Sequence, residues 1–229
     1  METQANPLVA LGLLRHNAPK TVAGYRRFRS IIDTDGALPA RVKRLFVACA
    51  ATVKGYEEMA LRELRCARGA GLSVDEAASA VAILSSVRGE GAAMRFHGLF
   101  LQAYPDAVDP EAPDDDLIVQ AGEAEANFLT YFETMPPSLG KLIELKPVGA
   151  DAYYLMREGT LSGTALDPAH AELLLVTVLV ADYSNWATVH MNGARKAGAS
   201  EEAVAEAVLC AVPTSGLSGW VVGATAMDA

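Results

Sequence analysis

The sequence predicts an all-α protein made of two tandem helical units, and three observations support this prediction. Several stretches are rich in alanine and nearly free of glycine and proline, a composition that favours helices. One residue pattern occurs twice, at an interval of 127 positions. An acidic, proline-rich segment lies between the two copies. We therefore expect two similar units related by a pseudo-twofold axis.

Six helices are predicted from the alanine-rich stretches. The apolar run 173–180 has a composition that also suits a strand, but its counterpart 45–51 contains too much alanine for one. Both runs are therefore predicted to be buried helices. The segment that contains Pro213 and Gly216 predicts a helix break and restart. The six predicted helices span residues 41–54, 57–69, 74–87, 171–181, 183–197 and 201–211.

The repeat is clearest where one helix ends and the next begins. Residues 67–73 read Ala-Arg-Gly-Ala-Gly-Leu-Ser, and residues 194–200 read Ala-Arg-Lys-Ala-Gly-Ala-Ser. In each block a glycine ends one helix and a serine caps the next, and acidic residues follow that favour the positive end of a helix. This agreement of type and order indicates an internal duplication.

The segment between the two copies predicts a domain boundary. Residues 104–116 include three prolines and six acidic residues among thirteen, so this segment cannot bury much apolar surface. We expect a first unit at 1–104, an acidic linker at 105–116 on the surface, and a second unit at 117–229.

The composition excludes several classes of partner. Lys and Arg number 19 against 28 Asp and Glu, and the resulting net charge of -9 would be repelled by nucleic-acid phosphates. No apolar run approaches the roughly 18 residues that a membrane-spanning helix needs, and the N-terminal residues lack the pattern of a signal peptide. Cys49, Cys66 and Cys210 lie far apart, as expected for reduced thiols. The prediction is a cytoplasmic protein with neither a nucleic-acid nor a membrane partner.

A proton-transfer pair is predicted between two neighbouring helices. Tyr183, Trp186 and His190 recur at steps of three and four residues, so they share one helix face. If the chain turns back near Asp182, Glu172 and His190 face each other across a helical hairpin. A buried carboxylate beside an imidazole suits general acid–base chemistry. A purely structural ion pair is the alternative.

Two further groups of residues are weaker candidates for sites. His170, Glu172 and His190 are potential metal ligands, but no further ligand occurs at a suitable spacing, so no metal site is predicted. Arg195 is a candidate for binding a substrate carboxylate, and the alternative for it is a solvated surface position.

A more specific pattern surrounds the predicted pair. Leu-Asp-Pro at 166–168 precedes Glu172-Leu-Leu, and His190 is followed by Ala-Arg-Lys-Ala-Gly-Ala-Ser-Glu-Glu. This pattern resembles the motif of the carboxymuconolactone decarboxylase superfamily, which also contains the alkyl hydroperoxidase D-like proteins. The resemblance covers both halves of the chain, more weakly in the first, where Arg44 stands in place of the acid and Glu63 in place of the histidine. It implies an all-helical fold, no bound cofactor, and assembly into a homo-oligomer, either a trimer or a hexamer.

The resemblance also separates two kinds of chemistry. In the peroxidase branch a CxxC pair precedes the histidine, and the corresponding positions here are Tyr183 and Trp186. Neither side chain can form a disulfide or attack a peroxide as a thiolate. Trp186 instead resembles the aromatic residue that precedes the histidine in the decarboxylase branch.

The predicted function is that of a cofactor-independent lyase or isomerase acting on a small carboxylated or lactone-type substrate. His190 and Glu172 are expected to be catalytic, and Trp186, Tyr183 and Arg195 to bind the substrate or exclude water. One alternative is a non-catalytic binding or assembly protein of the same fold. A thiol hydroperoxide reductase is the other alternative, and it would need the absent cysteine pair.

Overall fold

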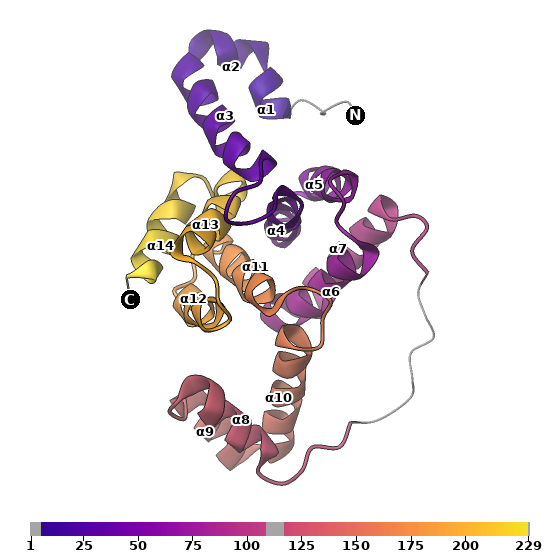
Figure 1. The fold of residues 1–229 in the computed structure, drawn as a ribbon, viewed down its shortest axis with the longest axis vertical. Coiled ribbons are helices and arrows are strands. Elements are labelled where there is room, and N and C mark those ends of the chain that lie inside the picture. Colours follow the sequence, from indigo (N-terminus) through magenta and orange to yellow (C-terminus); the bar gives the residue numbers. More distant parts are fainter. Residues whose placement is uncertain (1–5, 109–116, 229) are drawn as a thin grey trace.

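The structure, a computed structural model, describes residues 6–108 and 117–228. Within these residues the chain forms fourteen helices and no strand, which confirms the all-α prediction (Figure 1). None of these helices is both long and apolar enough to cross a membrane. The first half contains α1 Pro7–Ala10, α2 Gly12–Asn17, α3 Pro19–Asp33, α4 Ala40–Val53, α5 Glu57–Gly69, α6 Val74–Arg88 and α7 Glu90–Ala103. The second half contains α8 Glu123–Phe132, α9 Pro137–Leu145, α10 Pro147–Leu161, α11 Pro168–Ala181, α12 Ala187–Lys196, α13 Glu201–Ser215 and α14 Leu217–Met227.

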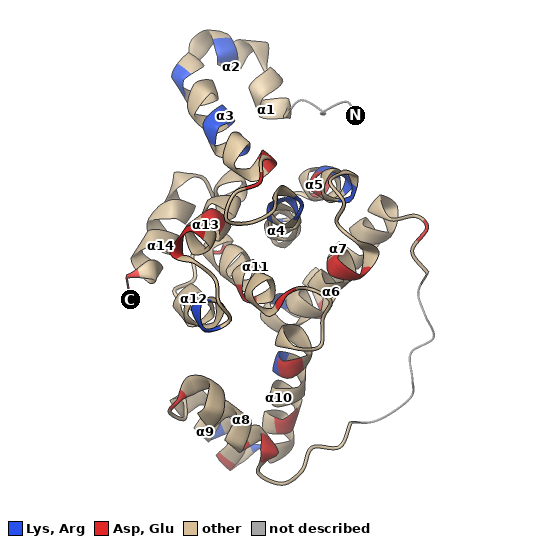
Figure 2. Cartoon of the chain, in the orientation of Figure 1, with Lys and Arg blue, Asp and Glu red and all other residues tan. Residues whose placement is uncertain are grey.

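The helices α4 and α11 lie at the centre of the fold (Figure 1). All residues of α11 from Ala171 onward are buried, so no face of this helix meets solvent. A helix that is buried on all sides shows no polar stripe, which is why the composition of the run 173–180 also suits a strand. The structure confirms that this run is helical. Glu172 is the one Asp, Glu, Lys or Arg residue of α11, and α14, which is tan in Figure 2, has none.

From α3 in the first half and α10 in the second, the two halves have the same order of helices. α3 and α10 have 15 residues each, as do α6 and α13, whereas α4 and α11 have 14 each. The turn glycines Gly71 and Gly198 have φ values of 92° and 97°, and Ser73 and Ser200 cap the helices that follow them. These correspondences agree with a duplication, while the pseudo-twofold relation itself stays a prediction.

One long helix of each half packs against a helix of the other half. α3 packs against α13, and α10 packs against α6. The Ala37 amide donates to Oε1 of Glu206 on α13 at 3.2 Å, and the Ala165 amide donates to Oγ of Ser79 on α6 at 3.0 Å. One continuous cluster of buried apolar side chains includes residues of both halves. The halves are therefore interlocked around a shared core.

The helix predicted at 183–197 begins later than expected. α12 starts at Ala187, and Tyr183 lies in the preceding turn with a φ of 58°. This left-handed conformation is unfavourable for a residue with a Cβ atom, and Gly55 adopts it in the corresponding turn of the first half, with a φ of 76°. The prediction that Tyr183 shares a helix face with His190 is therefore wrong.

The predicted helix break and restart in the segment with Pro213 and Gly216 is confirmed, although the first of the two helices extends past its predicted end at residue 211. α13 continues through Pro213 to Ser215, and the chain breaks at Gly216, which has a φ of 67°. Proline removes one hydrogen bond from a helix interior, and only two helical residues follow it here.

The proposed linker at 105–116 is described only in part. α7 ends at Ala103, and the Asp106 side chain is exposed and paired with Arg68 at 3.2 Å. Residues 109–116 lie outside the described part of the chain, so the domain boundary remains a prediction.

Candidate active site

Glu172 is a buried carboxylate in an apolar helix. It lies in the second turn of α11, which Asp167 caps by accepting a hydrogen bond from the Ala169 amide at 2.9 Å. Only 4% of Glu172 is exposed. An isolated carboxylate in such a place would be strongly destabilising. Its two oxygens are instead satisfied by two different side chains.

The first partner of Glu172 is His190 on α12. Nδ1 of His190 lies 2.7 Å from Oε2 of Glu172, as the hairpin of α11 and α12 predicts. An ionised carboxylate only accepts hydrogen bonds, so Nδ1 carries the proton, and in the neutral imidazole Nε2 keeps its lone pair. The His190 side chain is 24% exposed and lines a cavity. The arrangement leaves His190 able to accept a proton from a bound molecule.

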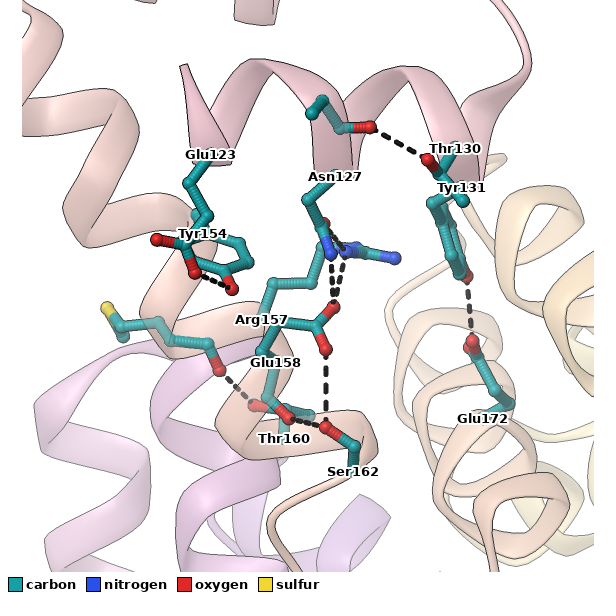
Figure 3. A network of polar contacts seen from close by, with 12 residues as sticks. Glu123, Asn127, Thr130, Tyr131, Tyr154, Arg157, Glu158, Thr160, Ser162 and Glu172 are labelled. Carbon is teal, nitrogen blue, oxygen red and sulfur yellow. Dashed lines mark hydrogen bonds and ion pairs between the residues drawn. The ribbon is translucent and has the colours of Figure 1, made fainter. Parts of the chain in front are cut away.

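The second partner is Tyr131 on α8, to which the sequence does not point. Its hydroxyl donates to Oε1 of Glu172 at 2.7 Å (Figure 3). Burial, together with the Glu172 charge, raises the pKa of the Tyr131 phenol well above its ordinary value. The phenol therefore remains protonated and continues to donate to the carboxylate.

Arg157 on α10 extends this network. Its guanidinium carbon lies 3.6 Å from the centre of the Tyr131 ring, a distance typical of a cation–π contact. Nη1 donates to Oδ1 of Asn127 at 2.7 Å and to Oε1 of Glu158 at 3.0 Å (Figure 3). The repeat contains a signal for this residue, because Arg157 follows Pro147 by the same interval as Arg29 follows Pro19.

The cavity beside His190 has a volume of about 280 Å³. Both halves of the chain line it, because Ser86 and Val87 come from α6 while the remaining residues come from the second half. Apart from Arg157 and His190, the lining is mostly apolar and aromatic. Small-molecule sites have this character, with a few polar groups in a largely apolar hollow.

Gly193 is needed for the close approach of these groups. It lies on α12, one turn beyond His190 along the helix. A Cβ atom built at this position would lie 2.6 Å from the Tyr131 hydroxyl oxygen and would also collide with the Glu172 carboxylate. The absence of a side chain at Gly193 therefore gives Tyr131 and Glu172 the space in which to meet.

The three residues predicted to bind substrate have different positions. Trp186 lines the cavity but remains 67% exposed. Tyr183 lies elsewhere, and its hydroxyl donates to the Ser215 carbonyl at 2.8 Å. Arg195 pairs with Glu201 through two hydrogen bonds of 2.6 and 2.9 Å. Among the described residues, those that line the cavity beside His190 include neither Tyr183 nor Arg195.

These positions have physical reasons. The left-handed turn at Tyr183 directs the residue away from the face of α12 that contains His190, so a helical spacing does not apply to it. Arg195 is near the end of α12, where its guanidinium meets the acidic first turn of α13. Its pKa is raised by the hydrogen bond to Glu201. Arg195 is thus occupied by a contact between helices.

The first half contains ion pairs at the corresponding positions. Glu63, which stands in place of the histidine, is buried and paired with Arg29 and Arg62, each at 3.1 Å. Arg44, which stands in place of the acid, is paired with Asp33 at 3.1 Å. Nothing in this arrangement offers an imidazole, so within the described residues the paired histidine and glutamate are found in the second half.

The cysteines are poorly placed for thiol chemistry. All three are free, and Cys49 and Cys210 are buried. Burial raises the pKa of both buried thiols above the ordinary value, and the thiolate is the reactive form. In the described part of the chain, no three His, Cys, Asp or Glu side chains gather as potential metal ligands.

The comparison with protein families covers the helices that contain the pair. No curated protein matches the chain. The matching family segment includes α10 to α14, with Glu172, His190 and Arg157, but not Tyr131. Residues 147–229 match the carboxymuconolactone decarboxylase family, which confirms for this part of the chain the superfamily that its motif resembles.

Proposed function

We propose that the chain is a cofactor-independent lyase or isomerase that moves a proton at a carbon atom next to a carbonyl group. The substrate is a small carboxylated or lactone-type molecule bound beside His190. The observation that supports this most directly is the 2.7 Å contact between Nδ1 of His190, which lines a cavity, and the buried carboxylate of Glu172.

The proposed mechanism assigns the proton to Nε2 of His190. Nε2 takes a proton from the substrate carbon, and the electron pair of the broken C–H bond moves toward the carbonyl oxygen. Glu172 stabilises the imidazolium that forms, and Tyr131 keeps the carboxylate in place. In an isomerisation the imidazolium then returns the proton to another carbon. In a decarboxylation the bond to the carboxylate carbon breaks instead of a C–H bond, and its electron pair moves toward the carbonyl oxygen as carbon dioxide leaves. His190, protonated from water, then gives its proton to the carbon that held the carboxylate.

A non-catalytic binding or assembly protein is the second candidate. It is favoured by the first half, where the site is replaced by ion pairs while the helices are kept. The enzyme is preferred because the first half shows that this helical hairpin forms without a His–Glu pair. The fold therefore does not require the His–Glu pair, and a pair that lies beside a cavity without being required for folding suits a chemical role better than a structural one.

Deuterium exchange tests the proposal even where the product has not been identified. Wild-type protein is incubated in D2O with a set of small β-keto acids and carboxylated γ-lactones, and proton NMR follows deuterium uptake and carbon dioxide release. We expect uptake at one carbon of at least one compound, abolished in His190→Gln. Arg27→Gln is the matched control, because the exposed Arg27 side chain bonds, among the described residues, only to the Ala23 carbonyl of its own helix. Exchange that is absent throughout, or equal in His190→Gln, would favour the binding protein.

The proposal includes the assembly and location implied by the resemblance. The second half supplies the site, the first half supplies one wall of the cavity, and the chains form trimers or hexamers in the cytoplasm. Light scattering coupled to size-exclusion chromatography measures the mass of the assembly, and a monomer at micromolar concentration would contradict this part.

A further inference from the structure

We propose that Arg157 binds a carboxylate group of the ligand, so that the cavity selects a monoanion with an apolar body. This inference rests on the proposed function, because it assigns the substrate class of the same cavity. The role of binding a carboxylate, predicted for Arg195 from the sequence, is assigned to Arg157 instead. The Arg195 guanidinium is occupied by Glu201, whereas Arg157 lines the cavity.

Arg157 is held in a fixed orientation. Its guanidinium lies over the Tyr131 ring, with 3.6 Å between the guanidinium carbon and the ring centre. Nη1 is held by Asn127 and Glu158 (Figure 3). A planar guanidinium that is fixed before binding loses little further freedom when it pairs with a carboxylate.

Half of this guanidinium is available for a ligand. Among the described residues, Nη2 and Nε of Arg157 have no hydrogen-bond partner, although the side chain is only 11% exposed. Nε and Nη2 form the edge that binds a carboxylate through two parallel hydrogen bonds. Glu158 does not fill this role, because its contact is with Nη1 and its Oε1 also accepts from Asn127 at 3.1 Å.

Tyr131 places this cation next to the proposed proton-transfer pair. Its ring lies against Arg157, while its hydroxyl donates to Glu172, the partner of His190. The Arg157 guanidinium and the Glu172 carboxylate therefore contact the same tyrosine side chain. A carboxylate held by Arg157 would thus bring its adjacent carbon toward the imidazole.

The rest of the cavity determines the kind of ligand. Its walls include Val87, Met156, Leu161, Leu175 and Leu179. A volume of about 280 Å³ is small for a ligand site. Glu172 does not line this cavity and its oxygens are occupied by Tyr131 and His190. The combination of one available cation with apolar walls fits one carboxylate on a compact hydrocarbon body.

Isothermal titration calorimetry tests this assignment without turnover. The probes are benzoate, phenylacetate and 3-phenylpropanoate, each paired with its uncharged primary amide. We expect wild-type protein to bind at least one carboxylate about 10-fold to 100-fold more tightly than its amide, the range for hydrogen bonds to charged groups. Arg157→Gln should lose this preference, and Arg157→Lys should keep part of it because the charge remains but the fork is lost. Arg27→Gln should keep all of it.

The controls separate this inference from the proposed function. His190→Gln removes proton transfer but should keep the preference for the carboxylate. A role of Arg157 limited to positioning Tyr131 would weaken both members of each pair equally in Arg157→Gln, and that result would overturn the inference. So would a wild-type protein that binds no carboxylate, or one that binds acid and amide alike. If Arg157→Gln loses its thermal unfolding transition, the Arg157→Lys titration decides between the same outcomes.

The two proposals can fail separately. Binding of carboxylates through Arg157 without any deuterium exchange would leave the inference standing and contradict the proposed chemistry. Exchange that depends on His190 but is unchanged in Arg157→Gln would support the proposed chemistry and contradict the role assigned to Arg157.

Discussion

The Tyr131 hydroxyl and the Glu172 carboxylate lie 2.7 Å apart, although 41 positions separate them in the sequence. Through this hydrogen bond the side chain of Tyr131 on α8 reaches Glu172 on α11 (Figure 3). The same carboxylate bonds to His190 through its other oxygen. One buried acid therefore joins a phenol that remains protonated to an imidazole at the wall of the cavity.

Replacing Tyr131 by phenylalanine should weaken both the fold and the site. The change leaves one oxygen of a buried carboxylate without a donor, which costs about 1–3 kcal/mol of unfolding free energy. Urea denaturation measures this loss. Tyr154→Phe is the control, because Tyr154 donates to the more accessible Glu123 carboxylate at 2.8 Å, and it should cost clearly less. Equal losses in the two variants would contradict the buried network.

Replacing Glu172 by glutamine should lower the rate more than the affinity. Glutamine has nearly the same shape, but it does not fix the Nδ1–H tautomer of His190 and does not stabilise an imidazolium. Loss of such an orienting carboxylate lowers kcat by about 10²-fold to 10⁴-fold in comparable pairs. The deuterium-exchange rate at saturating substrate provides the measurement. Glu201→Gln, at an exposed carboxylate on α13, should retain the wild-type rate, and a Glu172→Gln variant of similar rate would exclude a proton-transfer role for the pair.

Gly193 offers a test of the local geometry. A Cβ atom in Gly193→Ala would press against the Tyr131 hydroxyl and the Glu172 carboxylate. We expect a loss of exchange activity and of stability, even though alanine favours helices by about 1 kcal/mol over glycine. Gly98→Ala on α7 is the matched control, because a Cβ atom there would meet no described atom within 4 Å apart from the neighbouring backbone of its own helix. Gly98→Ala should therefore stabilise the fold, and a stabilised, fully active Gly193→Ala would show that the site is less tightly packed than described.

The parts of the fold that could be predicted are those where local sequence signals are strong. The helix predicted at 57–69 matches α5, and the glycine and serine turns at Gly71 and Gly198 separate helices as expected. The convergence of Glu172 and His190 could also be predicted, because it depends only on the geometry of one short hairpin.

Other parts depend on packing between distant segments. Tyr131 comes from α8, a helix outside the repeated pattern, and nothing near Glu172 in the sequence indicates it. Tyr183 departs from its predicted place because its tertiary environment holds a left-handed turn that helical periodicity does not anticipate. Arg195 resembles an anion-binding residue in sequence, but its availability depends on Glu201, which occupies its guanidinium.

Thiol reactivity should differ among the three cysteines. Burial raises the pKa of Cys49 and Cys210, so both thiols stay protonated at a pH where an ordinary thiol ionises, and their alkylation is slowed. Cys66 is more accessible. At about pH 8.5, the ordinary thiol pKa, iodoacetamide should modify Cys66 first in native protein and all three in denaturant, as mass spectrometry can show. Alkyl hydroperoxide reduction in a coupled assay should not depend on any cysteine, and a variant such as Cys66→Ser that abolished it would revive the peroxidase alternative.

The last prediction concerns the hydrogen bonds that join the two halves. Glu206 on α13 accepts hydrogen bonds from the Leu38 amide and from Nζ of the fully buried Lys43, each at 2.9 Å. Glu206→Ala would leave a buried ammonium group without its partner, a change that typically costs about 3–5 kcal/mol. Ser79 has the corresponding position on α6, and it accepts one hydrogen bond from the other half, that of the Ala165 amide, while its hydroxyl donates to the Asp75 carbonyl of its own helix at 2.8 Å. Ser79→Ala removes no charge and should cost only about 0.5–1.5 kcal/mol.

Urea denaturation of the two variants compares these costs directly. Because both contacts join one half to the other, we expect each variant to unfold in one transition with the slope of the wild-type protein. A second transition in Glu206→Ala would mean that the halves unfold independently once this contact is removed. Losses of equal size would show that Lys43 is not destabilised without Glu206, and that the interlocking depends on the apolar core shared by α4, α11 and α13.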